Sequence, residues 1–149
     1  MNLILKTKVN GNYKDIIKKF DLDLFEALAP PGPKIEIVKF TGSKKGDQVH
    51  IRFLSPIKTE WISDITADEI NEREAFFIDE GVKLPFPLKY WKHKHIVRKI
   101  DENNSEIIDD ITYKGVNGLV TLLMYPAMFI GFFPRKRIYR NIFGKSKIG

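Results

Sequence analysis

Apolar and polar residues alternate with a period of two over most of the first 114 residues. Residues 2–9 place Leu3, Leu5 and Val9 on one side and lysines on the other, which predicts a half-buried strand. The same period predicts six further strands, at residues 34–42, 48–54, 57–67, 69–79, 88–100 and 106–114. We expect the turn between 57–67 and 69–79 to lie near Ala67 and Asp68. Because no helix separates consecutive strands of this series, the sheet should be antiparallel.

Two short helices are predicted between the first strand and the second. Asn12, or Gly11 before it, can cap the first, because both residue types favour the N-cap position. Asp21 can cap the second, which carries Leu24, Phe25 and Leu28 and ends before the prolines of residues 30–33. The expected order is therefore strand, two helices, six strands and a C-terminal helical segment.

The C-terminal segment has no charged residue from 115 to 134, and apolar residues continue at helical spacing to Phe143. We predict one long helix, bent near Pro126 or Pro134, or two successive helices. The uncharged run is as long as the ~20 residues that span a bilayer, so a membrane-anchored domain through residues 115–134 is one alternative. A helix that is apolar nearly all round is usually buried on both sides, and the strands need such a cover. We therefore favour a buried helix.

Length and composition indicate one globular α+β domain over residues 1–149. The chain has no cysteine, which excludes disulfides and thiolate metal sites and fits a cytoplasmic location. The net charge of +6 comes from the C-terminus, because residues 114–149 carry 7 basic residues and no acidic one. These cations predict peripheral contact with an anionic membrane, through Arg135, Lys136, Arg137 and Arg140. No recognition module supports nucleic acid as the partner.

Strand periodicity also brings the candidate chemistry together. Trp91, His93 and His95 share one face of their strand, and Asp109 shares a face with Tyr113 on the next. An inward Asp109 could accept a hydrogen bond from a histidine N–H. Such a pair either anchors a ligand or simply satisfies buried polar groups. The sequence identifies no carboxylate partner for a metal site on the two histidines, so we expect no metal and no cofactor.

Further candidate contacts for a ligand are aromatic and methionine side chains. Aromatic rings can stack on a ligand, although they also pack ordinary cores. Met124 and Met128, four residues apart on the last helix, suit an adaptable pocket wall. The complete predicted ligand-binding set is Trp61, Phe77, Trp91, His93, His95, Asp109, Tyr113, Met124 and Met128.

A set of motifs in order over residues 61–113 resembles the helix-grip (START/SRPBCC, birch-pollen-allergen-like) superfamily. The branch in question is that of the ligand-binding or cyclase/dehydrase-like proteins. The motifs are Phe77-Ile78-Asp79, Leu84-Pro85-Phe86, Trp91-Lys92-His93-Lys94-His95 and Asp109-Asp110-Ile111-Thr112-Tyr113. This resemblance implies seven curved antiparallel strands, closed over a long C-terminal helix around an apolar pocket. It also implies a hydrophobic ligand, since proteins of this fold carry lipids, sterols or polyketides and a few are cyclases.

The leading hypothesis from the sequence is binding or carriage of a hydrophobic small molecule, a lipid among the candidates, between the sheet and the C-terminal helix. One alternative is a cyclase- or dehydratase-type enzyme with His93 or His95 as the base. The other is the membrane-anchored domain described above. We judge a non-enzymatic protein better supported, because no nucleophile or second proton donor is identifiable near the histidines.

Overall fold

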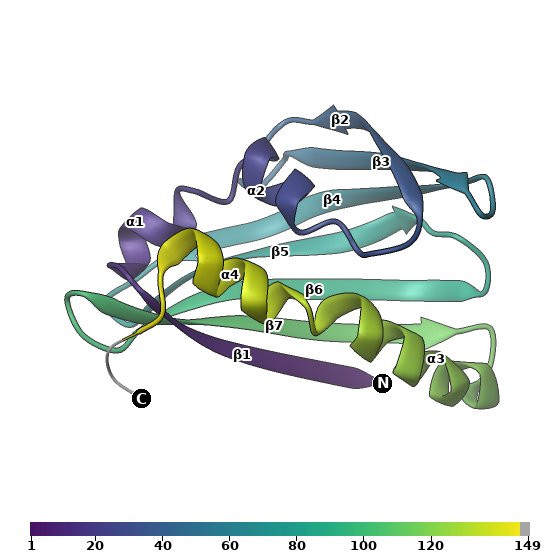
Figure 1. Ribbon diagram of the computed structural model, residues 1–149. Helices are drawn as coiled ribbons and strands as arrows, with labels where there is room; N and C mark the ends of the chain where they lie inside the picture. The colour runs from purple at the N-terminus through teal and green to yellow at the C-terminus, as the bar shows by residue number, and fades with distance from the viewer. Residues whose placement is uncertain (147–149) are drawn as a thin grey trace.

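The computed structural model of the chain describes residues 1–146, and in them a curved seven-stranded antiparallel sheet is covered by helices. The strand order is β1-β7-β6-β5-β4-β3-β2, so β1 and β2 form the two edges. In Figure 1 the C-terminal helices cross one face of the sheet, beside the two short ones. The strands are β1 (Asn2–Asn10), β2 (Lys34–Phe40), β3 (Gln48–Ser55), β4 (Thr59–Ile70), β5 (Glu74–Lys83), β6 (Leu88–Lys99) and β7 (Asn104–Gly115). The helices are α1 (Tyr13–Ile17), α2 (Leu22–Ala27), α3 (Gly118–Phe132) and α4 (Arg135–Phe143). The predicted helix-grip α+β fold is confirmed.

Local sequence signals account for the short helices. The Asn12 side chain accepts a hydrogen bond from the backbone N–H of Lys14 at 3.0 Å, and Asp21 accepts one from Leu24 at 3.0 Å. Both residues therefore act as N-caps, as their sequence positions predicted. Asn117 caps α3 in the same way, through the backbone N–H of Val120.

The turn between β4 and β5 lies at residues 71–73, and the predicted position near Ala67 and Asp68 is wrong. The Asn71 side-chain oxygen fixes the turn by accepting hydrogen bonds from two backbone N–H groups, at 2.9 and 3.0 Å. The alternating pattern changes earlier because the pairing register shifts between Ile65 and Ala67. A register shift between two paired strands thus interrupts the alternation of apolar and polar residues in the same way as a turn.

The C-terminal segment divides at Phe133 and Pro134 into α3 and α4. Pro126 lies inside α3 without ending it. α4 packs against β1, and the chain beyond it is fixed there by a hydrogen bond of 2.9 Å from the Asn10 N–H to the Gly144 carbonyl. Of the two predicted bends, the division of the helix therefore falls at Pro134.

The prediction that this helix is buried on both sides is wrong for α3. None of its residues is buried, and Leu119 and Leu123 are each 67% exposed on its outer face. Its inner face, with Met128 and Phe132, packs against the buried cluster around Trp91. The helix forms a single layer over the sheet, so only one of its apolar faces is covered. The sequence does not show which face of α3 is exposed, because a helix that is apolar on every side has no polar face to indicate where the solvent lies.

Candidate functional site

A cavity of about 180 Å³ lies between the sheet and helices α2, α3 and α4. Most of its wall is apolar, and the wall includes Leu24, Phe25, Phe40, Ile51, Met128 and Phe132. An engineered apolar cavity of roughly 150 Å³ in another protein holds one benzene molecule. The cavity described here therefore has room for a molecule of about one ring.

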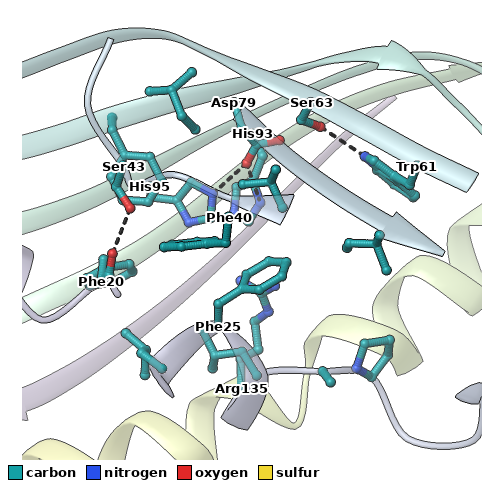
Figure 2. Close-up of a pocket in the computed structure, with 18 of the residues that line it drawn as sticks. Phe20, Phe25, Phe40, Ser43, Trp61, Ser63, Asp79, His93, His95 and Arg135 are labelled. Carbon is teal, nitrogen blue, oxygen red and sulfur yellow. Dashed lines mark hydrogen bonds and ion pairs between the residues drawn. The ribbon is translucent and has the colours of Figure 1, made fainter. Parts of the chain in front are cut away.

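Polar side chains gather at one end of this cavity. Figure 2 shows Asp79, His93 and His95 on the sheet side and Arg135 on the helix side. Asp79 of β5 pairs in register with His93 of β6, and alternate β6 residues face the same way. Trp91, His93 and His95 are all buried on the inner face, so the prediction that this row points inward is confirmed.

Asp79 is a carboxylate held by two donors. Its Oδ2 accepts a hydrogen bond from His95 Nε2 at 2.7 Å, and its Oδ1 accepts one from Trp91 Nε1 at 2.8 Å. Burial by itself would raise the pKa of Asp79, but the hydrogen bond and charge interaction with His95 outweigh it and lower the pKa. Asp79 is therefore ionised at neutral pH. Its side chain is 15% exposed, which keeps it accessible from the cavity.

His95 is a neutral imidazole in a fixed orientation. Burial, and secondly the neighbouring His93, lower the pKa of His95 to about 4. Because the Asp79 carboxylate can only accept, we assign the imidazole proton to Nε2, which leaves Nδ1 as an acceptor. Among the described residues Nδ1 has no hydrogen-bond partner. Phe77 stacks on the ring with centroids 4.3 Å apart and fixes its plane.

A second histidine–carboxylate pair lies beside the first on the same face of the sheet, between β6 and β7. His93 Nε2 is 2.9 Å from Asp109 Oδ1, and their side chains are 2% and 3% exposed. Asp109 also accepts hydrogen bonds of 3.3 Å from Arg135 Nη1 and from the Tyr139 hydroxyl. Burial alone would raise the pKa of Asp109, but the hydrogen bond from His93 and the Arg135 charge lower it. The predicted Asp109–histidine hydrogen bond is confirmed; Asp109 is buried away from the cavity, whereas the His93 ring also forms part of the cavity wall.

Asp79, His93 and His95 also offer three metal-ligand atoms within 4.8 Å of one another. We expected no metal because no carboxylate partner was identifiable, and Asp79 removes that reason. The two imidazole rings are stacked, however, with centroids 3.6 Å apart and an interplanar angle of 27°. Lone pairs lie in the ring planes, so in two stacked rings they run side by side instead of converging on one ion. A metal would require one ring to turn out of the stack.

The predicted ligand contacts divide between the cavity and the core. Those that line the cavity are Trp61, Phe77, Trp91, His93, His95 and Met128. Asp109 lies beside His93 on the neighbouring strand, while Tyr113 and Met124 belong to the apolar cluster at the β7–α3 corner. There the Tyr113 hydroxyl donates to the backbone carbonyl of Thr121 at 3.4 Å. These three side chains are not part of the cavity wall: Asp109 and Tyr113 lie on β7, one strand beyond the β6 side chains that form the wall, and Met124 packs in the same cluster as Tyr113.

The basic residues of the C-terminal segment are divided between the core and the surface. Arg135 was predicted to face a membrane, but it is buried and directed at Asp109, so that prediction is wrong. Lys136 donates to the backbone carbonyl of Lys6 at 2.7 Å, and Arg137 and Arg140 are exposed. Lys147, the last cation of the cluster, lies outside the described residues. Sequence distance concealed the Arg135 contact, since Asp109 is 26 residues away.

The predicted set omits most of the apolar cavity wall, and it also omits two polar residues of interest, Asp79 and Ser63. Asp79 stood within a motif but was given no role, because the strand register that brings it to His95 is a long-range property. Ser63, which accepts a hydrogen bond from Trp61 Nε1 at 3.0 Å, was not considered. Its alternation with Trp61 on β4 is the signal that could have indicated it.

Comparison with known proteins supports the architecture. No protein-family model and no curated protein sequence matches the chain. Among solved structures, the chain is similar to truncated norcoclaurine synthase from Thalictrum flavum at 14% identity and a TM-score of 0.68, over 98% of this chain and 95% of that one. A protein from Thermobifida fusca matches at 13% identity and a TM-score of 0.60, over 97% of each chain. Protein Ms6760 from Mycobacterium smegmatis matches at 15% identity and a TM-score of 0.59, over 96% of this chain and 88% of that one. At such identities the likeness is one of fold, and the fold of this chain is the helix-grip fold.

Proposed function

We propose that the chain binds a small molecule of about one ring in the cavity, with a hydrogen-bond donor of the ligand directed at Asp79. The observation that carries this proposal is a mostly apolar cavity with an ionised carboxylate at one end. Burial of the ring would drive binding, and the carboxylate would set its orientation. One structure of norcoclaurine synthase, at 14% identity, is a complex with dopamine and hydroxybenzaldehyde, which are one-ring molecules. That complex supports the proposed size of ligand.

The size of the cavity argues against a lipid as the resident ligand. A space of about 180 Å³ is close to that which one benzene fills in another protein. A long acyl chain would extend beyond this space. The proposal therefore narrows the class expected from the sequence, from hydrophobic molecules in general to compact ones.

The charge balance indicates which polar group the ligand carries. The negative charge of Asp109 is matched by Arg135 at 3.3 Å. Among residues 1–146, Asp79 receives hydrogen bonds from the Trp91 indole and from His95 alone, and His95 is neutral at pH values above its pKa of about 4. The cavity end near Asp79 thus favours a neutral or cationic donor over an anion. We expect a phenol or an amine to bind, and a carboxylate to be disfavoured.

Acid–base catalysis is less well supported than binding. General acids and bases work best with a pKa near the working pH. Here the pKa of His95 is lowered to about 4 and that of Asp79 also falls, so both move away from neutrality. The cyclase or dehydratase alternative therefore lacks a poised proton donor or acceptor, although His95 does line the cavity.

Calorimetric titration with four one-ring probes tests the proposal. Phenol and benzylamine should bind more tightly than benzene, because only these two probes donate a hydrogen bond to Asp79. Their affinity should exceed that of benzoate by about tenfold or more. Ile51→Trp, which fills the cavity, should abolish binding of every probe. Ile4→Trp on the outer face of β1 adds the same side chain at a position that is 50% exposed and should change nothing. Equal affinity for all four probes, or binding that survives Ile51→Trp, would reject the proposed site.

A further inference from the structure

The outer face of α3 is an uncovered apolar surface. Leu119, Leu123 and Ile130 are 67%, 67% and 66% exposed, and Leu122 and Phe133 are 57% and 49% exposed. Their spacing of three, four and seven residues places them along one side of the helix. A row of this kind on a soluble domain marks an interaction surface, because single exposed apolar residues are usually scattered.

The charge next to this face is of one sign. α3 carries no charged residue, and the outward positions that follow it on α4 include Arg137 and Arg140, both exposed. No acidic residue occurs anywhere in the sequence after Asp110. The two helices therefore combine an apolar row with cations at one end, and neither helix contributes an acidic group that would repel an anion.

We propose that the outer face of α3, together with Arg137 and Arg140, docks on an anionic lipid bilayer with the helix lying in the plane of the interface. Apolar residues would enter the headgroup boundary, and the arginines would contact lipid phosphates. A second copy of the chain that docks through the same two helices is a poorer occupant, because α3 and α4 carry no acidic side chain to pair with those arginines. Charge complementarity thus selects the membrane.

The helix lies on the bilayer and does not cross it. By length and composition alone, a helix over residues 118–143 could cross a membrane. The 15 residues of α3 alone extend only about 22 Å, less than the roughly 30 Å of a hydrocarbon core. α4 cannot supply the remainder, because Arg135 and Tyr139 are buried against Asp109.

Docking would bring the cavity close to the bilayer. Met128 and Phe132, on the inner side of the same helix, line the cavity. The cavity would then be separated from the lipid by one helix diameter, about 10 Å. A compact apolar ligand partitions into membranes, so the bilayer would serve as its reservoir. This consequence rests on the proposed function, whereas docking itself does not.

Co-sedimentation of the full-length chain with vesicles tests the docking surface. We expect binding to vesicles of equal parts phosphatidylcholine and phosphatidylglycerol, and little binding to phosphatidylcholine alone. Leu119→Gln, Leu122→Gln and Leu123→Gln combined should lower the partition coefficient about tenfold or more. Arg137→Gln with Arg140→Gln should lower it about tenfold on the mixed vesicles and remove the preference for them. Ile4→Gln, at an exposed apolar position on the outer face of β1, is the matched control and should bind like the wild type.

The same experiment defines the results that contradict the proposal. Failure to bind the mixed vesicles, or binding that the triple substitution leaves unchanged, would overturn it. A dimer that the triple substitution dissociates, in a chain that ignores vesicles, would assign the face to a second copy. Phenol titration of each variant in the absence of lipid separates this result from the cavity, because the substituted side chains point away from it.

Discussion

Two histidine–carboxylate pairs lie side by side in the same sheet, and their surroundings differ in exposure and in charge. Asp79 and His95 meet at 2.7 Å at the end of the cavity, with side chains 15% and 10% exposed. Asp109 and His93 meet at 2.9 Å, are 3% and 2% exposed, and are closed over by Arg135 and Tyr139. The residue types are the same, so the two pairs differ only in accessibility and in charge compensation. Under the proposed function, this difference makes Asp79 the ligand contact and Asp109 a residue that stabilises the fold.

The largest loss of stability should follow from removing the carboxylate of the buried Asp109–His93 pair. Asp109→Ala leaves Arg135 as a buried cation without its carboxylate, which we expect to cost about 3–5 kcal/mol in the free energy of unfolding. Urea unfolding monitored by tryptophan fluorescence measures it. Asp109→Asn, which keeps the shape and part of the hydrogen bonding, provides a second variant if the alanine form does not fold.

Asp110 supplies the control for that loss. It faces the opposite side of β7, where its Oδ1 accepts a hydrogen bond from the Asn2 side chain at the surface. Asp110→Asn should change the free energy of unfolding by less than about 0.5 kcal/mol. If substitution of Asp110 and substitution of Asp109 lowered the free energy of unfolding by similar amounts, Asp109 would not have the stabilising role proposed for it.

The second effect is a dependence of stability on pH that originates at the cavity pair. The pKa of His95 is about 4 in the folded chain and 6.5 in the unfolded chain, so the unfolded state binds the extra proton between these values. The free energy of unfolding is therefore highest above pH 6.5. It should fall by up to about 3 kcal/mol as the pH is lowered from 6.5 to about 4. The titratable groups next to His95 are Asp79, His93 and Asp109, and both carboxylates titrate below this window because their pKa values are lowered.

Urea midpoints recorded between pH 7 and pH 4 test this effect. His95→Gln keeps an N–H for Asp79 but has no proton to gain, so its stability should vary much less over the same range. A wild-type midpoint that is flat from pH 6.5 to pH 4, or an unchanged slope in His95→Gln, would contradict the neutral, buried state of this imidazole.

The smallest effect on stability should come from Asp79→Asn. The pair faces a cavity, so the loss of one charged acceptor should cost about 1–2 kcal/mol, less than at Asp109. The same change should weaken phenol or benzylamine binding about tenfold and leave benzene affinity nearly unchanged. A substitution that destabilises the chain as much as Asp109→Ala would make the two pairs equivalent and remove the distinction between them.

The fold could be predicted from the sequence because its evidence is local. Each element is predicted by residues within it or next to it. Period-two alternation predicts the strands, the caps at Asn12 and Asp21 predict the short helices, and the uncharged final segment predicts the C-terminal helices. The inward row of Trp91, His93 and His95 followed from alternation alone. The turn at residues 71–73 was misplaced, because a register shift within a strand pair has the same local pattern as a turn.

The arrangement of the site could be predicted only in part, because it depends on contacts between distant segments. The Asp109–His93 pair could be foreseen from adjacent strands, but Asp79 and Arg135 reach the same place from β5 and α4. Arg135 was assigned to the surface because a basic run looks uniform in sequence, while helical geometry turns one of its members inward. The same geometry leaves the outer face of α3 exposed, which an all-round apolar pattern cannot reveal.

The most direct test of the ligand site uses the two tryptophans, the only ones in the chain. Both line the cavity, and their indole N–H groups donate to Asp79, from Trp91, and to Ser63, from Trp61. A ¹H–¹⁵N spectrum of the full-length protein therefore contains two indole signals that report on the site during a titration with phenol. We predict saturable shifts of both signals, with the Trp91 shift lost in Asp79→Asn. Two indole signals that stay in place while phenol is raised to saturation would contradict binding at the Asp79 end of the cavity.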